Sequence, residues 1–331
     1  MDIIARALAT ALECGEGARG YTSPNPPVGA AILDRNGELV GRGATQPAGG
    51  PHAEIMALRE AGESAAGGTA VVTLEPCNHQ GRTGPCAQAL DDAGVDTVYY
   101  CQPDPNPVAT GGAAFLRERG IGAECLDIEV AALIPWLMAV RNNRPSVTLK
   151  FAQTLDGFTA ALDGTSQWIT GEVARSHVHR DRSKRDAIIV GTGTAIADNP
   201  SLTARDGERE LPTQPRRVVI GGRSLTGNAT NLHRLGFEQY RGIPDALWQL
   251  WETGARDVLV EGGAQLASGF LQAGLVDHIQ AYIAPTLLGQ GRGVLAEAVG
   301  LNINDAVRFS APRITHLGDD VLLEMTRKDG K

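Results

Sequence analysis

The chain lacks the features that would place it in a membrane or on a nucleic acid. No apolar run approaches the length of a membrane span, and residues 1–4 carry an acid and no long apolar core, so we expect neither a transmembrane segment nor a secretory signal. No cluster of basic residues occurs, and 38 acidic against 30 basic side chains leave a formal net charge of −8. This balance disfavours a polynucleotide substrate.

Cysteine is also scarce, with five in 331 residues. Cys77 and Cys86 each follow a proline, whereas Cys14, Cys101 and Cys125 are scattered. This odd, scattered remainder predicts reduced thiols in a cytoplasmic protein rather than a disulfide framework. The length suits two domains better than one, and 42% hydrophobic residues are enough for a core in each.

The most informative motif combines His52 and Glu54 with Cys77 and Cys86. One imidazole and two thiolates are three ligands, and a catalytic zinc site keeps its fourth position open to water. Glu54 is not needed as a ligand and is free to carry protons for a zinc-activated water. The motif therefore predicts hydrolytic deamination of a nucleobase-like ring, although eight residues separate the cysteines, more than in the short Cys-x-x-Cys form.

A purely structural interpretation of the same residues has to be weighed. A single cysteine is usually a small core hydrophobe, and a single histidine is usually a hydrogen-bonded core residue. The local pattern favours ligands, because a strand predicted at 69–74 ends just before Cys77, and His52 and Cys86 begin predicted helices. A structural zinc site needs a fourth ligand, and no further cysteine has a suitable spacing. We therefore predict a catalytic site.

Periodicity in the first part of the chain predicts a mixed three-layer α/β sandwich. The helix that ends this part stops before Arg144, so we predict domains at 1–144 and 145–331. The expected helices are at 3–14, from 52, from 86, 113–119 and 129–143, and the expected strands are at 28–33, 39–43, 69–74, 95–101 and 121–126.

The second part also alternates strands and helices. A strand at 257–260 runs into Gly262-Gly263 and a helix from Ala264, which would present backbone N–H groups to an anion, but the three-glycine Rossmann spacing is absent. Residues 206–241 show little periodicity. The other expected elements are strands at 147–152, 187–191, 216–220, 278–284 and 320–326 and a helix at 171–184.

Eight segments spread over the whole chain resemble one known family. It is the bifunctional riboflavin-biosynthesis deaminase–reductase family, RibD or RibG, whose longer spacing between cysteines is similar to that of Cys77 and Cys86. The segments are 24–29 (PNPPVG), 48–54 (AGGPHAE), 74–83 (LEPCNHQGRT), 104–107 (DPNP), 149–157 (LKFAQTLDG), 166–170 (SQWIT), 186–191 (DAIIVG) and 194–205 (TAIADNPSLTAR).

The resemblance implies a cytidine-deaminase-like domain followed by a dihydrofolate-reductase-like domain that uses NADPH. It implies zinc-dependent deamination of 2,5-diamino-6-(5-phosphoribosylamino)pyrimidin-4-one and then reduction of the ribosyl side chain to ribityl. The substrate would be a small phosphorylated pyrimidine, with no nucleic-acid or membrane partner, and the chain would form a homo-oligomer, a dimer or a tetramer.

The resemblance also implies roles for individual residues of the deaminase half. His52, Cys77 and Cys86 would bind zinc and Glu54 would be the catalytic acid–base. Asn25 would contact the ring or ribose, although an asparagine between prolines is also ordinary turn chemistry. The remaining expected substrate contacts are His79, Arg82, Asp104 and Asn106. Thr45 stands where the family usually has a histidine, so substrate binding there would be differently arranged.

In the reductase half the resemblance implies two sets of contacts. Arg182 and Arg205 suit the substrate phosphate, because a guanidinium binds phosphate with two hydrogen bonds, although most arginines on helices are simply solvated. Asp198 would be catalytic as the polar group near the reacting carbon, and Trp168 is either a cofactor contact or a core aromatic. The full expected sets are Ser166, Arg182, Leu202, Arg205 and Glu261 for substrate, and Lys150, Ala152, Trp168, Thr194, Asp198, Gly262 and Gly263 for cofactor.

Three rival functions remain open at the level of sequence. Residues 222–256 are shorter than in the family, so one rival is a deaminase whose C-terminal domain binds nucleotide but has lost reduction. A zinc-stabilised binding or scaffold protein is a second, disfavoured because a structural site gains nothing from the unligated Glu54. A polynucleotide deaminase is a third, disfavoured by the acidic charge balance.

Overall fold

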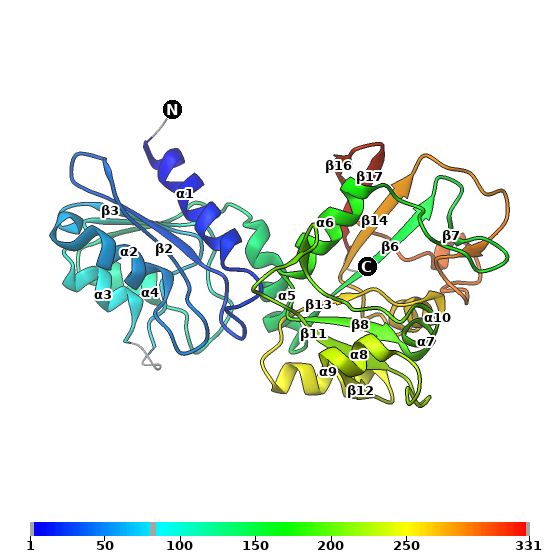
Figure 1. The fold of residues 1–331 in the computed structure, drawn as a ribbon. Coiled ribbons are helices and arrows are strands. Elements are labelled where there is room, and N and C mark those ends of the chain that lie inside the picture. Colours follow the sequence, from blue (N-terminus) through cyan, green and yellow to red (C-terminus); the bar gives the residue numbers. More distant parts are fainter. Residues whose placement is uncertain (1–2, 80–83, 329–331) are drawn as a thin grey trace. The chain divides into compact units, whose positions relative to one another are not determined.

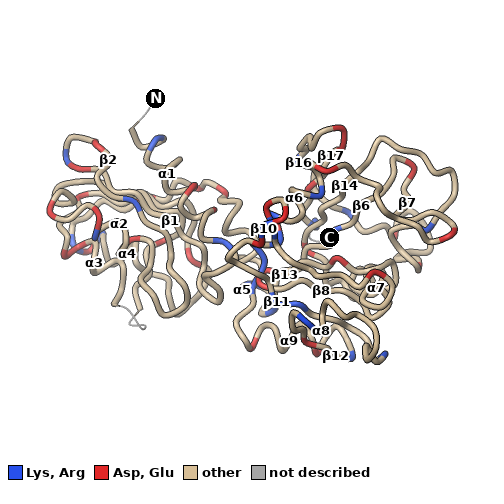
Figure 2. The backbone as a smooth tube through the Cα atoms, viewed as in Figure 1, with Lys and Arg blue, Asp and Glu red and all other residues tan. Residues whose placement is uncertain are grey.

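A computed structural model of the chain describes residues 3–79 and 84–328, so Arg82 lies outside the described residues. The chain divides into two compact units, Met1–Arg141 and Asn142–Lys331 (Figure 1). Acidic and basic residues are interspersed along the backbone of both units (Figure 2). Among the helices of the described residues, none is both long and apolar enough to span a bilayer.

The N-terminal unit is built on a five-stranded sheet in the order β2-β1-β3-β4-β5. The predicted hairpin is confirmed, because β1 and β2 pair antiparallel with Gly29 opposite Ala44. β3 is antiparallel to β1, while β4 and β5 continue parallel to β3. The strands are β1 (Gly29–Leu33), β2 (Leu39–Ala44), β3 (Thr69–Val72), β4 (Thr97–Tyr100) and β5 (Gly122–Cys125).

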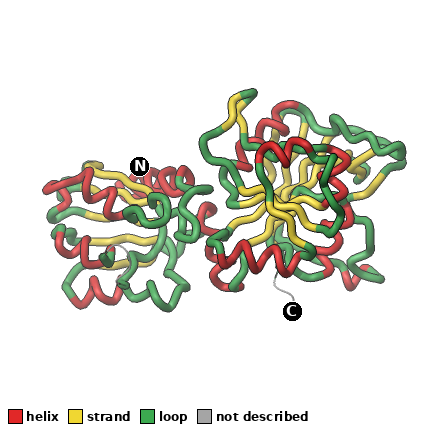
Figure 3. Tube along the Cα trace, turned by 60° about the horizontal axis from the view of Figure 1, so that its bottom comes forward, coloured by secondary structure: helices red, strands yellow, loops and turns green. Residues whose placement is uncertain are grey.

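Helices cover both faces of this sheet, which confirms the predicted three layers (Figure 3). Alternate residues of β1 serve the two faces: Ala31 packs with α1, and Ile32 packs with α2. α2 lies so close to β2 that a Cβ on Gly43 would come within 2.3 Å of the Ala53 carbonyl oxygen. The helices are α1 (Ile3–Gly17), α2 (Ala53–Ala61), α3 (Cys86–Asp92), α4 (Gly112–Glu118) and α5 (Ile134–Asn142), with 3-10 turns η1 (Gly62–Ala65) and η2 (Ala131–Leu133).

The C-terminal unit holds an eight-stranded sheet in the order β12-β11-β8-β13-β6-β14-β17-β16. The six strands from β12 to β14 are parallel, and β17 and β16 complete the sheet antiparallel. The strands are β6 (Ser146–Thr154), β8 (Ala187–Gly191), β11 (Arg216–Ile220), β12 (Glu238–Tyr240), β13 (Asp257–Val260), β14 (His278–Ala284), β16 (Arg313–Leu317) and β17 (Asp320–Thr326).

Two sets of helices sandwich the C-terminal sheet. α9 and α10 pack on the face that carries Ile189 and Val258, while α7 and α8 pack on the face that carries Ile188 and Leu259. The helices are α6 (Glu172–Arg182), α7 (Thr192–Asp198), α8 (Thr230–Leu235), α9 (Ile243–Glu252) and α10 (Ala264–Gln272). The smaller elements are β7 (Phe158–Ala160), β9 (Arg205–Asp206), β10 (Arg209–Glu210), β15 (Arg292–Gly293) and η3 (Ile303–Asp305).

The strand order of the C-terminal unit reverses direction between β8 and β13. After β8 the chain proceeds outward to β11 and β12, whereas after β13 it crosses to β14 on the far side of β6. Ligands of open α/β sheets bind at the carboxyl ends of the strands, beside such a switch point. The residues that follow β8 and β13, 192–194 and 261–263, therefore mark the expected cofactor edge.

Candidate active sites

The N-terminal unit brings together one imidazole and two thiols. Ligand atoms of His52, Cys77 and Cys86 all lie within 4.8 Å of one another. The His52 Nδ1 atom is 3.6 Å from Cys77 Sγ and 3.3 Å from Cys86 Sγ. The sequence pattern predicted this convergence from three separate segments.

Three elements produce this convergence. His52 is the N-cap residue of α2, Cys86 is the first residue of α3, and Cys77 follows the end of β3. The backbone N–H of Cys86 donates to Cys77 Sγ at 3.4 Å, and the N–H of Ala87 donates to the Cys77 carbonyl at 3.2 Å. The start of α3 is thus bonded directly to the segment that carries Cys77.

The donor set fits a zinc ion. A hydrogen bond from Cys86 lowers the pKa of Cys77 to about 4, against the effect of burial, so Cys77 is a thiolate at neutral pH. The same contact and burial raise the pKa of Cys86. One imidazole and two sulfurs are typical zinc donors, and three protein ligands leave the fourth position for water.

Glu54 lies beside this donor set without being part of it. Its side chain is on the first turn of α2 and is only 4% exposed. Burial, followed by the charge of Cys77, raises the pKa of Glu54 to about 7. A buried carboxyl with a pKa near neutrality is suited to accept and return a proton.

A second group of predicted residues lines the region beyond Cys77. Asp104 is 8% exposed, and burial raises its pKa to about 6 although the Asn106 N–H donates to it at 2.8 Å. The buried Nδ1 of His79 has no hydrogen-bond partner within residues 3–79 and 84–328. Such an atom is suited to receive a ligand.

The Asn25 segment is held by backbone hydrogen bonds. The Asn25 N–H donates to the Thr22 carbonyl at 3.0 Å, and the Trp136 indole donates to the Pro24 carbonyl at 2.9 Å. Thr45 is 2% exposed, and its hydroxyl accepts from the Val28 N–H at 3.2 Å. The threonine therefore helps to fix the residues that lead into β1.

Glu75 is a residue that the sequence reasoning missed. Its side-chain oxygens accept hydrogen bonds from the backbone of Asp104 (3.3 Å), Gly111 (3.2 Å) and Ala113 (3.1 Å) and from the Thr110 hydroxyl (3.5 Å). One buried carboxylate, two residues before Cys77, thus joins the zinc segment to the wall that carries Asp104. The available signal was an acidic residue at the exit of a buried strand, a position where a charge needs partners.

In the C-terminal unit, three predicted residues form a buried charged cluster. Arg182 binds Glu261 with two hydrogen bonds of 2.8 and 2.9 Å, and Lys150 Nζ lies 3.7 Å from the same carboxylate. Burial opposes the ionisation of Glu261, but Arg182 and Lys150 outweigh it and lower its pKa to about 2. Burial also lowers the pKa of Lys150.

The cluster extends towards the residues that follow α7. Arg182 Nη1 donates to the Thr203 carbonyl at 3.1 Å, and Arg205 Nε donates to the Thr203 hydroxyl at 2.6 Å. Leu202 is buried with a φ of +51°, a left-handed backbone that few leucines adopt. The two arginines expected to bind phosphate therefore meet around one residue, with the fork of Arg182 directed at Glu261.

The other predicted reductase residues lie outside the cluster of Lys150, Arg182 and Glu261, and some of them lie at the expected cofactor edge. The Gly263 N–H donates to the Thr194 hydroxyl at 3.1 Å, which bridges the ends of β13 and β8. Trp168 is 69% exposed beneath the Arg175 guanidinium, at 4.5 Å, so it is not a core aromatic. Ser166 and Asp198 are exposed, Ala152 lies on β6, and Gly262 precedes Gly263.

Comparisons with known proteins identify both halves. Residues 1–102 match the model of the cytidine and deoxycytidylate deaminase zinc-binding region, which spans all three proposed ligands, and residues 145–323 match the RibD C-terminal domain. The RibD protein of Corynebacterium ammoniagenes is 61% identical over 303 residues, 89% of each chain. This chain belongs to the RibD family.

Solved RibD structures resemble the chain along its whole length. RibD of Acinetobacter baumannii (form 1) is 36% identical with a TM-score of 0.84 and covers 99% of both chains. A Thermotoga maritima protein described as a diaminohydroxyphosphoribosylaminopyrimidine deaminase and 5-amino-6-(5-phosphoribosylamino)uracil reductase is 30% identical, with a TM-score of 0.85 and 98% and 99% coverage.

Membership of the RibD family confirms the predicted function. The chain is a bifunctional enzyme of riboflavin biosynthesis, with a zinc-dependent deaminase and an NADPH-dependent reductase that act on small molecules. The fold class is confirmed as well, with a deaminase-like first unit and a reductase-like second unit. The rival interpretations as a scaffold protein or as a deaminase without reduction do not describe this family.

Proposed function

We propose that residues 1–144 deaminate 2,5-diamino-6-(5-phosphoribosylamino)pyrimidin-4-one and that residues 145–331 reduce the ribosyl side chain of the product to ribityl. The observation that carries the proposal is the convergence of His52, Cys77 and Cys86 beside the buried Glu54. The description of the Thermotoga maritima relative supports the choice of substrate.

In the deaminase half, His52, Cys77 and Cys86 would hold the zinc ion. Zinc bound at such a site supplies a water molecule whose pKa is lowered towards neutrality. Glu54 would act as the general acid–base, accepting a proton from the attacking water and returning protons to the ring nitrogen and to the departing amine. Its burial excludes bulk water, so the proton stays within the site.

The substrate would contact residues of the segments that follow β3 and β4. His79 Nδ1, a buried atom without a partner among the described residues, would bond to the substrate, and the buried Asp104 would bind a ring amino group. Asn25 and Asn106 complete the set, with Arg82 outside the described residues as the expected phosphate contact.

In the reductase half, the cofactor supplies the hydride. Glu261 and Lys150 orient the sugar hydroxyls, and Glu261 holds Arg182 in a fixed direction. Arg205, with Arg182, binds the phosphate. Ser166 and Leu202 complete the substrate contacts. Asp198 is the polar group near the reacting carbon. The cofactor contacts are Lys150, Ala152, Trp168, Thr194, Asp198, Gly262 and Gly263.

The proposal is tested by a Glu54→Gln variant. The amide cannot shuttle protons, so ammonia release should fall by about 10²–10⁴-fold. Metal analysis should still find zinc, because the three ligands are unchanged. Reduction of the deaminated substrate, followed by the loss of NADPH absorbance, should be unaffected.

Two further variants control this experiment. Cys86→Ser should lose zinc and ammonia release together, whereas Glu63→Gln, an exposed acid beyond α2, should change neither. Loss of zinc from Glu54→Gln would mark the glutamate as a ligand. Undiminished ammonia release would remove it from the mechanism.

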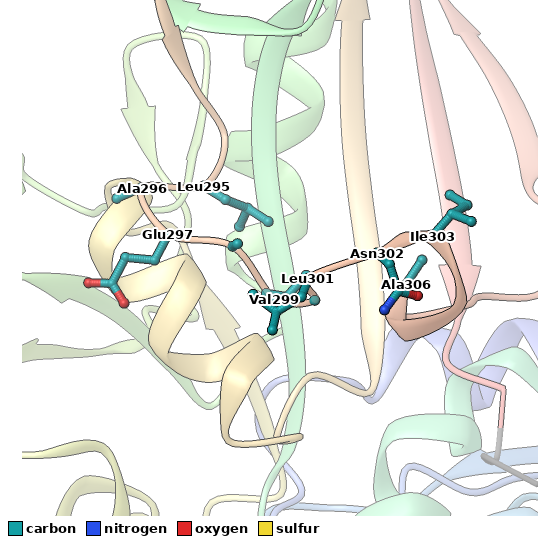
Figure 4. Close-up of a pocket in the computed structure, with 10 residues that line it drawn as sticks. Leu295, Ala296, Glu297, Val299, Leu301, Asn302, Ile303 and Ala306 are labelled. Carbon is teal, nitrogen blue, oxygen red and sulfur yellow. The ribbon is translucent and has the colours of Figure 1, made fainter.

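Assembly and location complete the proposal: the chain forms a homo-oligomer, a dimer or a tetramer, in the cytoplasm. All five cysteines are free thiols, as a reducing compartment favours. In the C-terminal unit, residues 295–303 and 306 line an open hollow of about 630 Å³, and Leu301 and Ile303 are among these residues (Figure 4). These two side chains are 97% and 75% exposed, which supports burial by another subunit. Light scattering that gives the monomer mass would contradict the assembly.

A further inference from the structure

An arginine that no predicted site includes lies beside the cofactor edge of the C-terminal unit. Arg223 follows the end of β11, and its Nε donates to the Thr192 hydroxyl at 3.3 Å. A Cβ on Gly193 would come within 2.9 Å of its Nη2. The guanidinium is thus folded back against the residues that directly follow β8.

The backbone that carries Arg223 is fixed in this position. The Gln239 side-chain amide, from β12, donates to the carbonyl oxygens of Gly221 (2.8 Å) and Arg223 (2.9 Å). Gly221 has a φ of +133°, and a Cβ there would come within 2.7 Å of Thr192 Oγ1. The turn therefore approaches Thr192 as closely as glycine allows, and it directs the exposed Arg223 side chain along the edge of the sheet.

The position of Arg223 after β11 places it near the expected adenosine end of the cofactor. β8 lies between β11 and β13 (Figure 1). The Gly263 N–H, after β13, donates to the Thr194 hydroxyl, after β8. The charged cluster of Lys150, Glu261 and Arg182, proposed to hold the reacting sugar, belongs to β6, β13 and α6. Arg223 comes from the opposite side, beyond β8, where the adenosine end of a dinucleotide would extend.

The charges at the end of β11 suit a phosphorylated ribose. In Rossmann folds, which also bind dinucleotides at the carboxyl ends of parallel strands, an acid binds the ribose 2′-hydroxyl of NAD, whereas an arginine accommodates the 2′-phosphate of NADP. Residues 217–224 contain no acid. Within residues 3–79 and 84–328, no carboxylate forms an ion pair with Arg223.

We infer that Arg223 binds the 2′-phosphate of NADPH and is the residue that makes this reductase prefer NADPH to NADH. The inference rests on the proposed cofactor edge between β8 and β13. A guanidinium is suited to this role because its fork can give a phosphate two charge-assisted hydrogen bonds. The Thr192 hydroxyl holds the guanidinium beside the strand end.

Binding of reduced cofactors, measured by nicotinamide fluorescence without turnover, tests the inference. In Arg223→Gln the affinity for NADPH should fall by about tenfold to a hundredfold, the range for loss of charge-assisted hydrogen bonds, while the affinity for NADH stays unchanged. The affinity of Arg223→Lys for NADPH should lie between those of wild type and Arg223→Gln, because lysine keeps the positive charge but lacks the forked guanidinium. Arg313→Gln, which removes the same charge from β16 at the other end of the sheet, should leave both affinities unchanged.

Wild-type protein provides a second measurement that needs no variant. It should bind 2′,5′-ADP at least about tenfold more tightly than 5′-AMP, because the two differ only in the 2′-phosphate. Equal affinities, or an Arg223→Gln variant with an unchanged ratio of NADPH to NADH affinity, would overturn the role of Arg223 and leave the cofactor edge intact. A wild-type protein that binds neither dinucleotide would overturn the cofactor edge as well.

Discussion

The polar side chains of the two active sites are balanced in opposite ways, by a bound cation in one site and by ion pairs within the chain in the other. In the deaminase site an imidazole, two thiols and the buried Glu54 converge, so a cation is needed to complete the site. In the reductase site Lys150 and Arg182 surround Glu261, so the charges already compensate one another. The first site therefore depends on its metal, whereas the second is preorganised by ion pairs within the chain.

The largest loss of stability is expected from Glu261→Gln, which removes the central carboxylate of the reductase cluster. The change leaves Arg182 and Lys150 buried without their counter-charge, at a cost of about 3–5 kcal/mol in the free energy of unfolding of the C-terminal unit at pH 7. Because the pKa of Glu261 is lowered from 4.5 to about 2, the wild-type advantage is complete above pH 4.5 and is lost as the pH falls towards 2. Urea unfolding followed by tryptophan fluorescence measures it, since Trp168, Trp248 and Trp251 all lie in this unit.

Glu238→Gln is the matched control for that variant. Glu238 also binds an arginine, Arg216, with two hydrogen bonds, but both side chains are about one-third exposed. Its loss should cost no more than about 1 kcal/mol. Equal losses for the two variants would show that the Glu261 cluster is an ordinary surface network rather than a preorganised site.

A smaller effect, on the deaminase side, is expected from Glu75→Gln. An amide nitrogen in place of one carboxylate oxygen cannot accept, so part of the set of bonds to Asp104, Gly111 and Ala113 is lost, at about 1–3 kcal/mol. The wall that carries Asp104 would shift while the zinc ligands stay in place. The KM for the pyrimidine should therefore rise more than kcat falls.

Zinc content separates positioning from metal binding in this experiment. Metal analysis of Glu75→Gln should match wild type, and Glu124→Gln, an exposed acid on β5, should match wild type in zinc, KM and stability. If zinc is lost, or if kcat falls with KM unchanged, the carboxylate acts on the metal segment rather than on the substrate wall.

The same contrast explains what the sequence could predict. His52, Cys77 and Cys86 were found because zinc chemistry demands particular residue types, and their segments fold as an α2 start, a strand exit and an α3 start, as expected. Most strands were also recovered, since β6, β8 and β13 are continuous buried apolar runs over much of their length.

Features that depend on distant pairing were not recoverable. Arg182 and Glu261 are 79 positions apart, and nothing in either segment shows that the arginine fork is directed at that carboxylate. Glu75 resembles any acid at the end of a strand until the 104–113 segment folds over it. The short elements α8 and β12 escaped because they are six residues or fewer. α9 was missed although its sequence carries the usual signals of a helix, a proline in the first turn and a regular apolar stripe.

The smallest expected effect concerns the pH dependence contributed by Asp104. Burial raises its pKa from 3.8 to about 6, so the folded state binds this proton more tightly than the unfolded chain does. Its contribution to stability is therefore greatest below pH 3.8 and is lost as the pH rises through 6. Asp104→Asn cannot titrate, so wild type should lose about 1–2 kcal/mol relative to the variant over this range, after allowance for solvent screening.

The free energies of unfolding of wild type and Asp104→Asn are compared at each pH, which separates the titration of Asp104 from effects of the metal. Protonation of the zinc ligands at low pH weakens both proteins, so the difference between their free energies of unfolding removes the part of this effect that does not act through Asp104. A difference that stays constant from pH 4 to 7 would mean that Asp104 is solvated and not part of a buried wall. The deaminase site would then owe its polarity to the metal ligands and Glu54 alone, which would make its contrast with the reductase cluster still sharper.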